Sequence, residues 1–234
     1  MDCVQLEEGL NKLGFDKPGL NADDRVMPLL SRYIEEIELF NPAYGLVKVK
    51  DRGELIVKHI LDSLAPAGIF RSLLNGMPTG RQIADAGSGA GLPGIPLAIC
   101  LRDVEFTLIE RMGRRAGFLR DAVAVLGLSN VRVEEADVET IARSSGGRFD
   151  AVVSRAFKPL DDALTAKLFA ILKQGGVIAA YKGRRQVIEE EMSRLLEHLA
   201  GKALGEILWE CIPVEVPFLD EERHLVLLRR LPRQ

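Results

Sequence analysis

A glycine-rich segment, IADAGSGAGLPG (83–94), is the part of the sequence whose residue types and spacing most clearly indicate chemistry. It follows a short apolar stretch typical of a β-strand and precedes a stretch typical of a helix. Gly87, Gly89 and Gly91 let the backbone turn tightly and let a ligand approach it closely. Pro93 suits the first turn of the expected helix. Such a loop lies beyond the carboxyl ends of the strands of an α/β sheet, where ligands bind.

Two nucleotide cofactors compete for this loop, and a purely structural turn is a third interpretation. Gly89, Gly91 and Gly94 match the G-x-G-x-x-G spacing that places a dinucleotide pyrophosphate on a helix N-terminus. The other frame starts at Asp85, two residues before Gly87. A carboxylate there would repel a pyrophosphate but would suit a ligand that carries an ammonium and a sulfonium. The acidic frame therefore favours S-adenosylmethionine.

Acids after the next two strands support a nucleoside ligand. Glu110 closes the segment FTLIE, and a carboxylate at that place can accept hydrogen bonds from both ribose hydroxyls. An ordinary exposed glutamate at a strand end is the alternative. The sequence DVE (137–139) follows the third expected strand and could meet an adenine through backbone groups and one acid. A helix N-cap at Asp137 explains that stretch almost as well.

The elements that must position these residues fall into two regions. A chain of 234 residues fits one large domain, or a catalytic domain with a small extension. Apolar residues between Leu29 and Phe40 recur at helical spacing, and Asn41-Pro42 is expected to end that helix. The turn-rich stretch NGMPTG (75–80) predicts a joint. We therefore expect a helical N-terminal extension over 1–75, packed on a catalytic domain over 76–234.

Beyond the joint, strand and helix patterns alternate. Strands are expected over 82–86, 104–109, 131–134, 149–154 and 176–181, and helices over 94–101, 114–126, near 138, 160–172 and 186–199. This alternation predicts an α/β fold with a doubly wound, mostly parallel sheet. The last two strands, near 207–216 and 225–230, have no clear helix between them. They predict a hairpin that contributes one antiparallel strand.

The overall composition excludes several classes of protein. Apolar residues make up 47% and charged residues 28%, the profile of a folded, soluble protein. With 31 basic and 34 acidic residues the net charge is −3, so a nucleic-acid site must come from local basic clusters. No apolar run approaches the length of a membrane span. Three scattered cysteines and an acidic N-terminal segment indicate a cytoplasmic protein without a metal site.

Several motifs together resemble the bacterial glucose-inhibited division protein B family, the ribosomal RNA small subunit methyltransferase G group. They are HILDSL (59–64), DAGSGAGLPGIPL (85–97), GRRAGFL (113–119), FDAVVSRAF (149–157), YKG (181–183) and ERHLV (222–226). Many methyltransferases share the glycine loop, whereas LPGIPL combined with SRAF is much more specific. The resemblance extends from about residue 30 to the end of the chain.

The resemblance implies a Rossmann-like class I S-adenosylmethionine-dependent methyltransferase with a helical N-terminal extension. It implies methyl transfer to N7 of a guanine in 16S ribosomal RNA, with that RNA or the small ribosomal subunit as partner and S-adenosylhomocysteine as product. The donor-binding residues carried over by position are Gly87, Leu92, Val138, Glu139 and Arg155. Ala86, Asp137 and the segment 41–47 depart from the family pattern.

Guanine N7 has a free lone pair and no proton at neutral pH, so its methylation needs no general base. The sequence offers no paired carboxylates or Ser-His-Asp arrangement that would serve as one. The protein must instead place N7 in line with the methyl carbon. The alternatives are a methyltransferase acting on another RNA, a protein or a small molecule, and a non-catalytic RNA-binding module of the same fold.

Arg155, Lys182 and His59 are the candidate catalytic residues. Arg155 ends the fourth expected strand and could bind the donor carboxylate or hold RNA, with a structural ion pair as the alternative. His59, together with Asp62, could order the extension over the pocket, although a His-Asp pair on a helix is more often structural. Phe157 could stack on the target base or belong to the apolar core.

Basic clusters at the carboxyl edge of the sheet predict contacts to RNA phosphates, and solvated surface charges are the alternative for any single residue. Lys182 and its neighbours follow the fifth expected strand, and a second cluster follows Glu110. The residues concerned are Arg114, Arg115, Lys182, Arg184 and Arg185.

Overall fold

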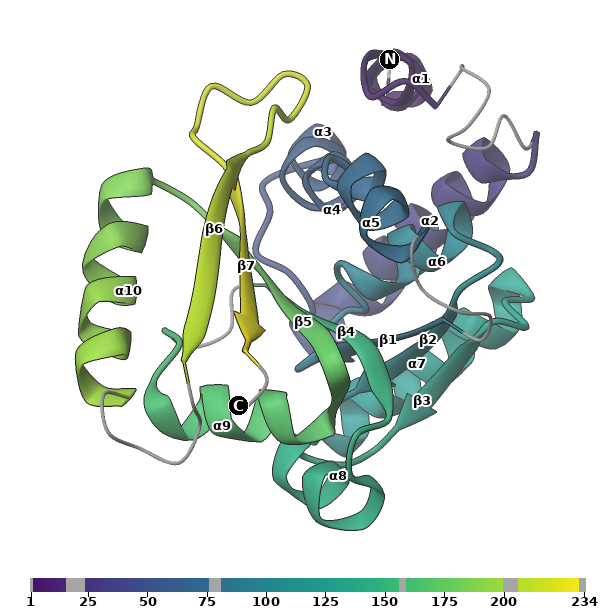
Figure 1. The fold of residues 1–234 in the computed structure, drawn as a ribbon. Coiled ribbons are helices and arrows are strands. Elements are labelled where there is room, and N and C mark those ends of the chain that lie inside the picture. Colours follow the sequence, from purple (N-terminus) through teal and green to yellow (C-terminus); the bar gives the residue numbers. More distant parts are fainter. Residues whose placement is uncertain (1, 16–23, 76–80, 156–158, 200–205, 232–234) are drawn as a thin grey trace.

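The computed structural model describes residues 2–15, 24–75, 81–155, 159–199 and 206–231 (Figure 1). Within these ranges the chain forms a seven-stranded sheet in the order β3-β2-β1-β4-β5-β7-β6. Strands β1 to β5 are parallel, and β7 runs antiparallel to both of its neighbours. The predicted doubly wound sheet and the C-terminal hairpin are confirmed. The strands are β1 (Gln82–Ala86), β2 (Glu105–Ile109), β3 (Val131–Glu134), β4 (Phe149–Arg155), β5 (Leu172–Lys182), β6 (Ile207–Pro213) and β7 (His224–Arg230).

Helices cover both faces of the sheet, which explains why its central strands are almost continuously apolar. The helices that follow the strands are α6 (Gly94–Cys100), α7 (Gly113–Leu126), α8 (Val138–Ser145), α9 (Asp162–Ile171) and α10 (Arg185–Leu199). The strand order reverses between β1 and β4, because the chain first builds outward through β2 and β3. The loop after β1 therefore lies at the topological switch point, where ligands bind in this class of fold.

The N-terminal extension packs on the face covered by α6 and α7, across the sheet from α9 and α10 (Figure 1). Its buried Leu30, Ile37 and Ile60 belong to the same apolar cluster as Leu97 and Phe118. The extension and this side of the sheet thus share one continuous core. The extension comprises α1 (Asp2–Lys12), α2 (Val26–Tyr44), α3 (Arg52–Leu55), the π-helix η1 (Ile56–Leu61), α4 (Asp62–Leu64) and α5 (Ala67–Asn75).

The predicted end of the second helix at Asn41-Pro42 is wrong, since α2 continues to Tyr44. Pro42 lies in the last turn, so its missing N–H costs one hydrogen bond without breaking the helix. Gly45 ends α2 in the left-handed conformation, with φ of 58° and its N–H bonded to the Asn41 carbonyl oxygen at 2.9 Å. The start of β5 at Leu172 also differs from the expected residue 176.

Candidate active site

The loop between β1 and α6 depends on glycines in the left-handed region. Gly87, Gly89 and Gly91 have φ of 74°, 59° and 91°. A Cβ at Gly91 would lie 2.5 Å from Ile95 Cδ1, so a side chain there would disturb α6. A Cβ at Gly89 would meet nothing nearer than the Gly87 carbonyl oxygen at 3.9 Å. The space beside Gly89 is therefore open to a ligand.

The loop is also supported from beneath by a side chain of the extension. Tyr33 of α2 is fully buried, and its hydroxyl donates a hydrogen bond to the Ala90 carbonyl oxygen at 2.6 Å. Because this bond fixes a backbone group between two of the glycines, the extension helps to set the conformation of the loop.

Asp85, at the end of β1, lies beneath the loop with 1% of its surface exposed. Its Oδ2 accepts a hydrogen bond from the Gly94 N–H at 2.8 Å, whereas Oδ1 has no hydrogen-bond partner in the part of the chain that the structure describes. Burial raises the pKa of this carboxyl to about 7, although the Gly94 N–H and the charge of Arg155 act in the opposite direction. Buried polar atoms are rarely left without a partner. An acceptor of this kind fits a ligand that brings a positive charge close to the loop.

Glu110 follows β2 and is almost completely buried beside the same loop. Its Oε2 accepts from the Gly89 N–H at 2.9 Å, and its Oε1 accepts from the Met112 N–H at 2.8 Å. Each oxygen of an ionised carboxylate has two lone-pair sites, so each can accept one further hydrogen bond. Glu110 thus both positions the glycine loop and retains the capacity to bind a pair of hydroxyls.

A cavity of about 540 Å³ opens beside these residues. Strand ends and loops at the switch point contribute Gly87, Glu110, Asp137, Val138 and Arg155 to its wall. The extension and the start of α7 contribute Tyr44, Arg114 and Arg115. We call it the donor cavity, after the methyl donor that the sequence predicts to bind here.

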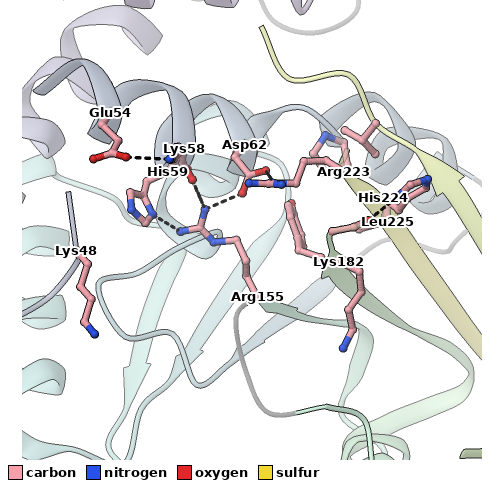
Figure 2. A pocket seen from close by; sticks show the side chains of 14 residues that line it. Lys48, Glu54, Lys58, His59, Asp62, Arg155, Lys182, Arg223, His224 and Leu225 are labelled. Carbon is pink, nitrogen blue, oxygen red and sulfur yellow. Dashed lines mark hydrogen bonds and ion pairs between the residues drawn. The ribbon is translucent and has the colours of Figure 1, made fainter. Parts of the chain in front are cut away.

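Arg155 lines the donor cavity and also a second cavity of about 400 Å³ (Figure 2). Its guanidinium is 11% exposed and lies against the helical segment 58–62 of the extension. Nη1 donates to Asp62 Oδ2 at 2.9 Å and to the Lys58 carbonyl oxygen at 3.2 Å, and Nη2 lies 3.1 Å from His59 Nδ1. Burial, followed by the charge of Arg155, lowers the pKa of His59 to about 4.

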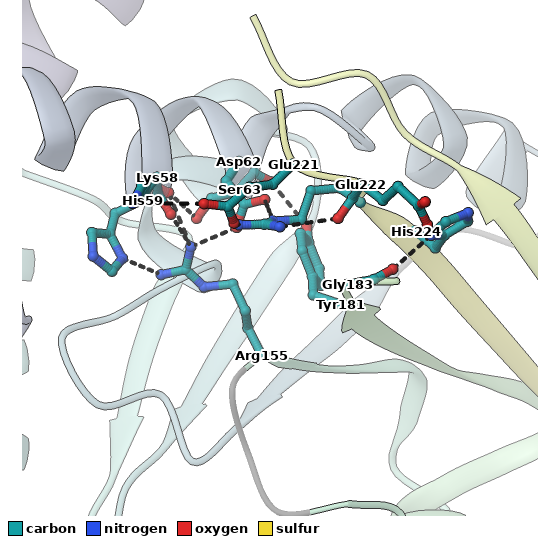
Figure 3. A network of polar contacts seen from close by, with 11 residues as sticks. Lys58, His59, Asp62, Ser63, Arg155, Tyr181, Gly183, Glu221, Glu222 and His224 are labelled. Atoms are coloured by element: carbon teal, nitrogen blue, oxygen red, sulfur yellow. Dashed lines mark hydrogen bonds and ion pairs between the residues drawn. The ribbon is translucent and has the colours of Figure 1, made fainter. Parts of the chain in front are cut away.

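Asp62 joins the extension to two distant parts of the fold (Figure 3). It is almost completely buried, and it accepts from Arg155 and, at 3.1 Å, from Arg223 Nε just before β7. Nearby, the Tyr181 hydroxyl of β5 donates to the Ser63 carbonyl oxygen at 2.8 Å. Buried charges that are paired in this way are costly to separate. The network therefore fixes the extension over the ends of β4, β5 and β7.

Most of the cations that line the second cavity have an acidic partner. Lys58 pairs with Glu54 at 2.8 Å, and Lys182 pairs with Glu191 at 2.7 Å. Within the described part of the chain, no hydrogen bond or ion pair involves the side chain of Lys48, which Figure 2 shows apart from the network. Lys48 is thus a cation at this cavity that remains able to bind an anion.

The comparisons with known proteins agree with this architecture. Residues 27–205 match the family model described as rRNA small subunit methyltransferase G. This chain belongs to that family. It is 41% identical over 215 residues to ribosomal RNA small subunit methyltransferase G of Treponema pallidum, covering 88% of each chain. It is 37% identical over 232 residues to the protein of that name from Acinetobacter baumannii, covering 97% of each chain.

Solved structures agree on the fold. One is provisionally described as an S-adenosyl-L-methionine-dependent methyltransferase from Methanococcus maripaludis, with a TM-score of 0.56 at 17% identity over 81% of this chain and 99% of that chain. Another is provisionally described as an O-methyltransferase from Klebsiella pneumoniae, with a TM-score of 0.60 at 14% identity over 98% and 100% of the two chains. The predicted methyltransferase fold is confirmed.

In this member of the methyltransferase G family, the residues predicted to bind the donor do not all line the donor cavity. Leu92 is 6% exposed and contributes to the apolar core. Glu139 lies in the first turn of α8, where it pairs with Arg143 and with Lys167 at 2.7 Å. Gly91 supports the loop through its conformation, and Asp85 lies beneath it.

The residues predicted to bind RNA are distributed over different surroundings. Arg114 lies over the Tyr44 ring at 5.7 Å, and Arg115 donates to the Gly45 carbonyl oxygen at 3.4 Å. Lys182 is held in its half-buried pair with Glu191. Arg184 is exposed, and Arg185 is exposed and paired with Glu189 at 2.9 Å. Phe157 lies outside the described residues.

Sequence reasoning missed the part that Tyr44 and Arg223 play in the two cavities. Tyr44 lies in the segment that departs from the family pattern, so no motif indicated it. Arg223 lies within the motif ERHLV, which is the only signal that could have drawn attention to it. Among the described residues, no group of three or more His, Cys, Asp or Glu could hold a metal ion, and none of the helices could cross a membrane.

Proposed function

We propose that this protein transfers a methyl group from S-adenosylmethionine to N7 of a guanine in 16S ribosomal RNA. The observation that carries the proposal is that two cavities meet at Arg155 in a chain of this family. One cavity is lined by a glycine loop and a buried carboxylate, which suit a nucleoside ligand. The other is lined by cationic and hydrogen-bonding side chains, which suit a nucleotide of RNA.

The residues in and beside the donor cavity fit the proposed cofactor. The open space beside Gly89 suits a ligand with a positive charge, as does the Oδ1 of Asp85 beneath the loop, which has no partner among the described residues. Glu110 would hold the ribose hydroxyls of the cofactor, and Val138 would contact its adenine. Arg155 would bind the carboxylate of its methionine part. When bound, S-adenosylmethionine supplies an electrophilic methyl group.

This chain contributes position and charge to the reaction. Holding two reactants in the right geometry can contribute about 7–11 kcal/mol. Methylation makes the guanine ring positive, so unpaired cations around it would oppose the reaction. The pairing of Arg155 and Arg223 with Asp62, and of Lys182 with Glu191, reduces that opposition.

The natural partner in this proposal is 16S ribosomal RNA, free or within the small ribosomal subunit, in the cytoplasm. The relatives are named for the same class of RNA. The runner-up functions are a methyltransferase for another RNA or a small molecule, and a non-catalytic RNA-binding module.

The test is transfer of tritiated methyl groups to small ribosomal subunits from cells that lack this protein. We expect label in N7-methylguanosine of the 16S RNA, and loss of that nucleotide from the RNA of the deficient cells. Label that appears in protein, in small molecules or at another RNA atom would contradict the proposal. Absence of S-adenosylmethionine binding in calorimetry would favour the non-catalytic module.

A further inference from the structure

His59 is placed where it can read the base that enters the second cavity. It lies on η1, a π-helix, which is an uncommon conformation often found at functional sites. It lines the second cavity together with Arg155, the residue shared with the donor cavity. A side chain here is therefore close to the meeting point of the two proposed ligands.

The contact with Arg155 determines which nitrogen of His59 carries the proton. Arg155 Nη2 lies 3.1 Å from His59 Nδ1. A guanidinium has donors and no acceptor, so Nδ1 must offer its lone pair. In the neutral imidazole the proton is then on Nε2. Because the pKa of His59 is lowered to about 4, the ring stays neutral at physiological pH.

The Nε2–H group of His59 has no hydrogen-bond partner among the described residues, and His59 lines a cavity. Arg155 holds it as a donor, and none of the described residues accepts from it. A ligand in the second cavity can therefore satisfy it with an acceptor atom.

The target guanine of the proposed reaction carries a suitable acceptor next to N7. Guanine and adenine both present N7 on the same edge of the base, so N7 alone does not distinguish them. The neighbouring group at position 6 does, because guanine has a carbonyl oxygen there and adenine has an amino group that donates. A fixed donor next to the N7 position would accept guanine and reject adenine.

We infer that His59 donates a hydrogen bond from Nε2 to O6 of the target guanine and thereby selects guanine over adenine, with Arg155 as the positioning residue that fixes its tautomer. This inference rests on the function proposed above. Methylation at N7 makes the ring positive and O6 a weaker acceptor, so the bond stabilises bound substrate more than product. Its loss should therefore raise KM and leave kcat unchanged or slightly higher.

The experiment compares His59→Phe, which keeps a ring without a donor, with His59→Gln, which restores an N–H donor. Each variant is assayed on small-subunit RNA containing guanosine, or 2-aminopurine riboside without O6, at the target position. We expect the wild type to prefer guanosine by about 10–100-fold. His59→Phe should lose most of this preference through KM, and His59→Gln should recover part of it. Calorimetry should give unchanged S-adenosylmethionine affinity in both variants.

Three results would overturn the inference. The first is a His59→Phe variant that binds the donor normally and still prefers guanosine as strongly as the wild type. The second is loss of donor affinity in His59→Phe, which would make His59 a support for Arg155 and not a reader of the base. The third is a wild-type protein that does not methylate guanine N7. This result would overturn the proposed function as well, which distinguishes it from the first two.

Discussion

Asp85→Asn should remove a pH-dependent cost from the stability of this protein. Burial raises the pKa of the Asp85 carboxyl from 3.8 to about 7. The folded protein therefore binds this proton more tightly than the unfolded chain does, so the stabilising effect is complete below pH 4 and is lost as pH rises through 7. An asparagine has nearly the same shape, and its Oδ1 can still accept from the Gly94 N–H.

The magnitude follows from the two pKa values. The difference between 3.8 and about 7 corresponds to about 4 kcal/mol when Asp85 is fully ionised. Between pH 5 and pH 8.5 the stability of the wild type should fall by about 3 kcal/mol relative to Asp85→Asn. The carboxylate thus destabilises the protein without ligand at neutral pH, as expected of a group retained for binding a cation.

The measurement is urea unfolding of both proteins at pH 5, 7 and 8.5, with Asp121→Asn on the exposed part of α7 as a matched control. Calorimetry should also show S-adenosylmethionine affinity rising from pH 5 to pH 8 in the wild type, because a cationic ligand favours the ionised carboxylate. Asp85→Asn should lack this rise. A stability difference between the two proteins that does not vary with pH would refute the reasoning.

Four further substitutions test the site. Gly89→Ala should cost only about 1–2 kcal/mol of stability, because an alanine is strained in the left-handed conformation. It should lower the affinity for S-adenosylmethionine more than tenfold in calorimetry, because the methyl group enters the space open to the ligand. A normal affinity would contradict the prediction that this loop binds the donor. Lys48→Ala should weaken binding to small subunits and reduce the salt dependence of that binding by about one phosphate contact, with an unchanged unfolding midpoint. Lys182→Ala should instead lower that midpoint, because it breaks a half-buried pair. Asp62→Asn should cost roughly 3–5 kcal/mol in urea unfolding. It leaves the guanidinium of Arg155 without its carboxylate partner and takes one of two carboxylates from Arg223, which keeps Glu221. An unchanged midpoint would show that the network does not hold the extension.

Much of the sheet could be predicted because its determinants are local. Strands buried on both faces read as apolar runs, as in the AVV of β4, and helices between them impose the parallel order. The glycine loop was also predictable, since its left-handed backbone requires glycine at particular positions. The end of α2 was not, because a proline in a last turn removes only one hydrogen bond and a glycine three residues later decides the boundary.

The contacts that assemble the site were less accessible to sequence reasoning. Asp62 meets Arg155 across 93 residues and Arg223 across 161, and no local pattern records such a distance. Lys182 belongs to a run of basic residues of the kind that binds RNA. In the structure, however, it pairs with Glu191 on the following helix. Charge along the chain therefore indicated which residues could bind phosphate, and only the fold showed which of them are already paired.

The hydrogen bond between the Tyr33 hydroxyl and the Ala90 carbonyl oxygen joins α2 to a loop that is synthesised later, which affects the order in which the chain can fold. Synthesis produces α2 well before the loop and α7. Until these emerge, only neighbours within the extension, such as α1 and α3, can cover its apolar face. The N-terminal helices of a nascent chain should accordingly remain open to proteases and chaperones until about residue 126 has emerged, and only then become resistant.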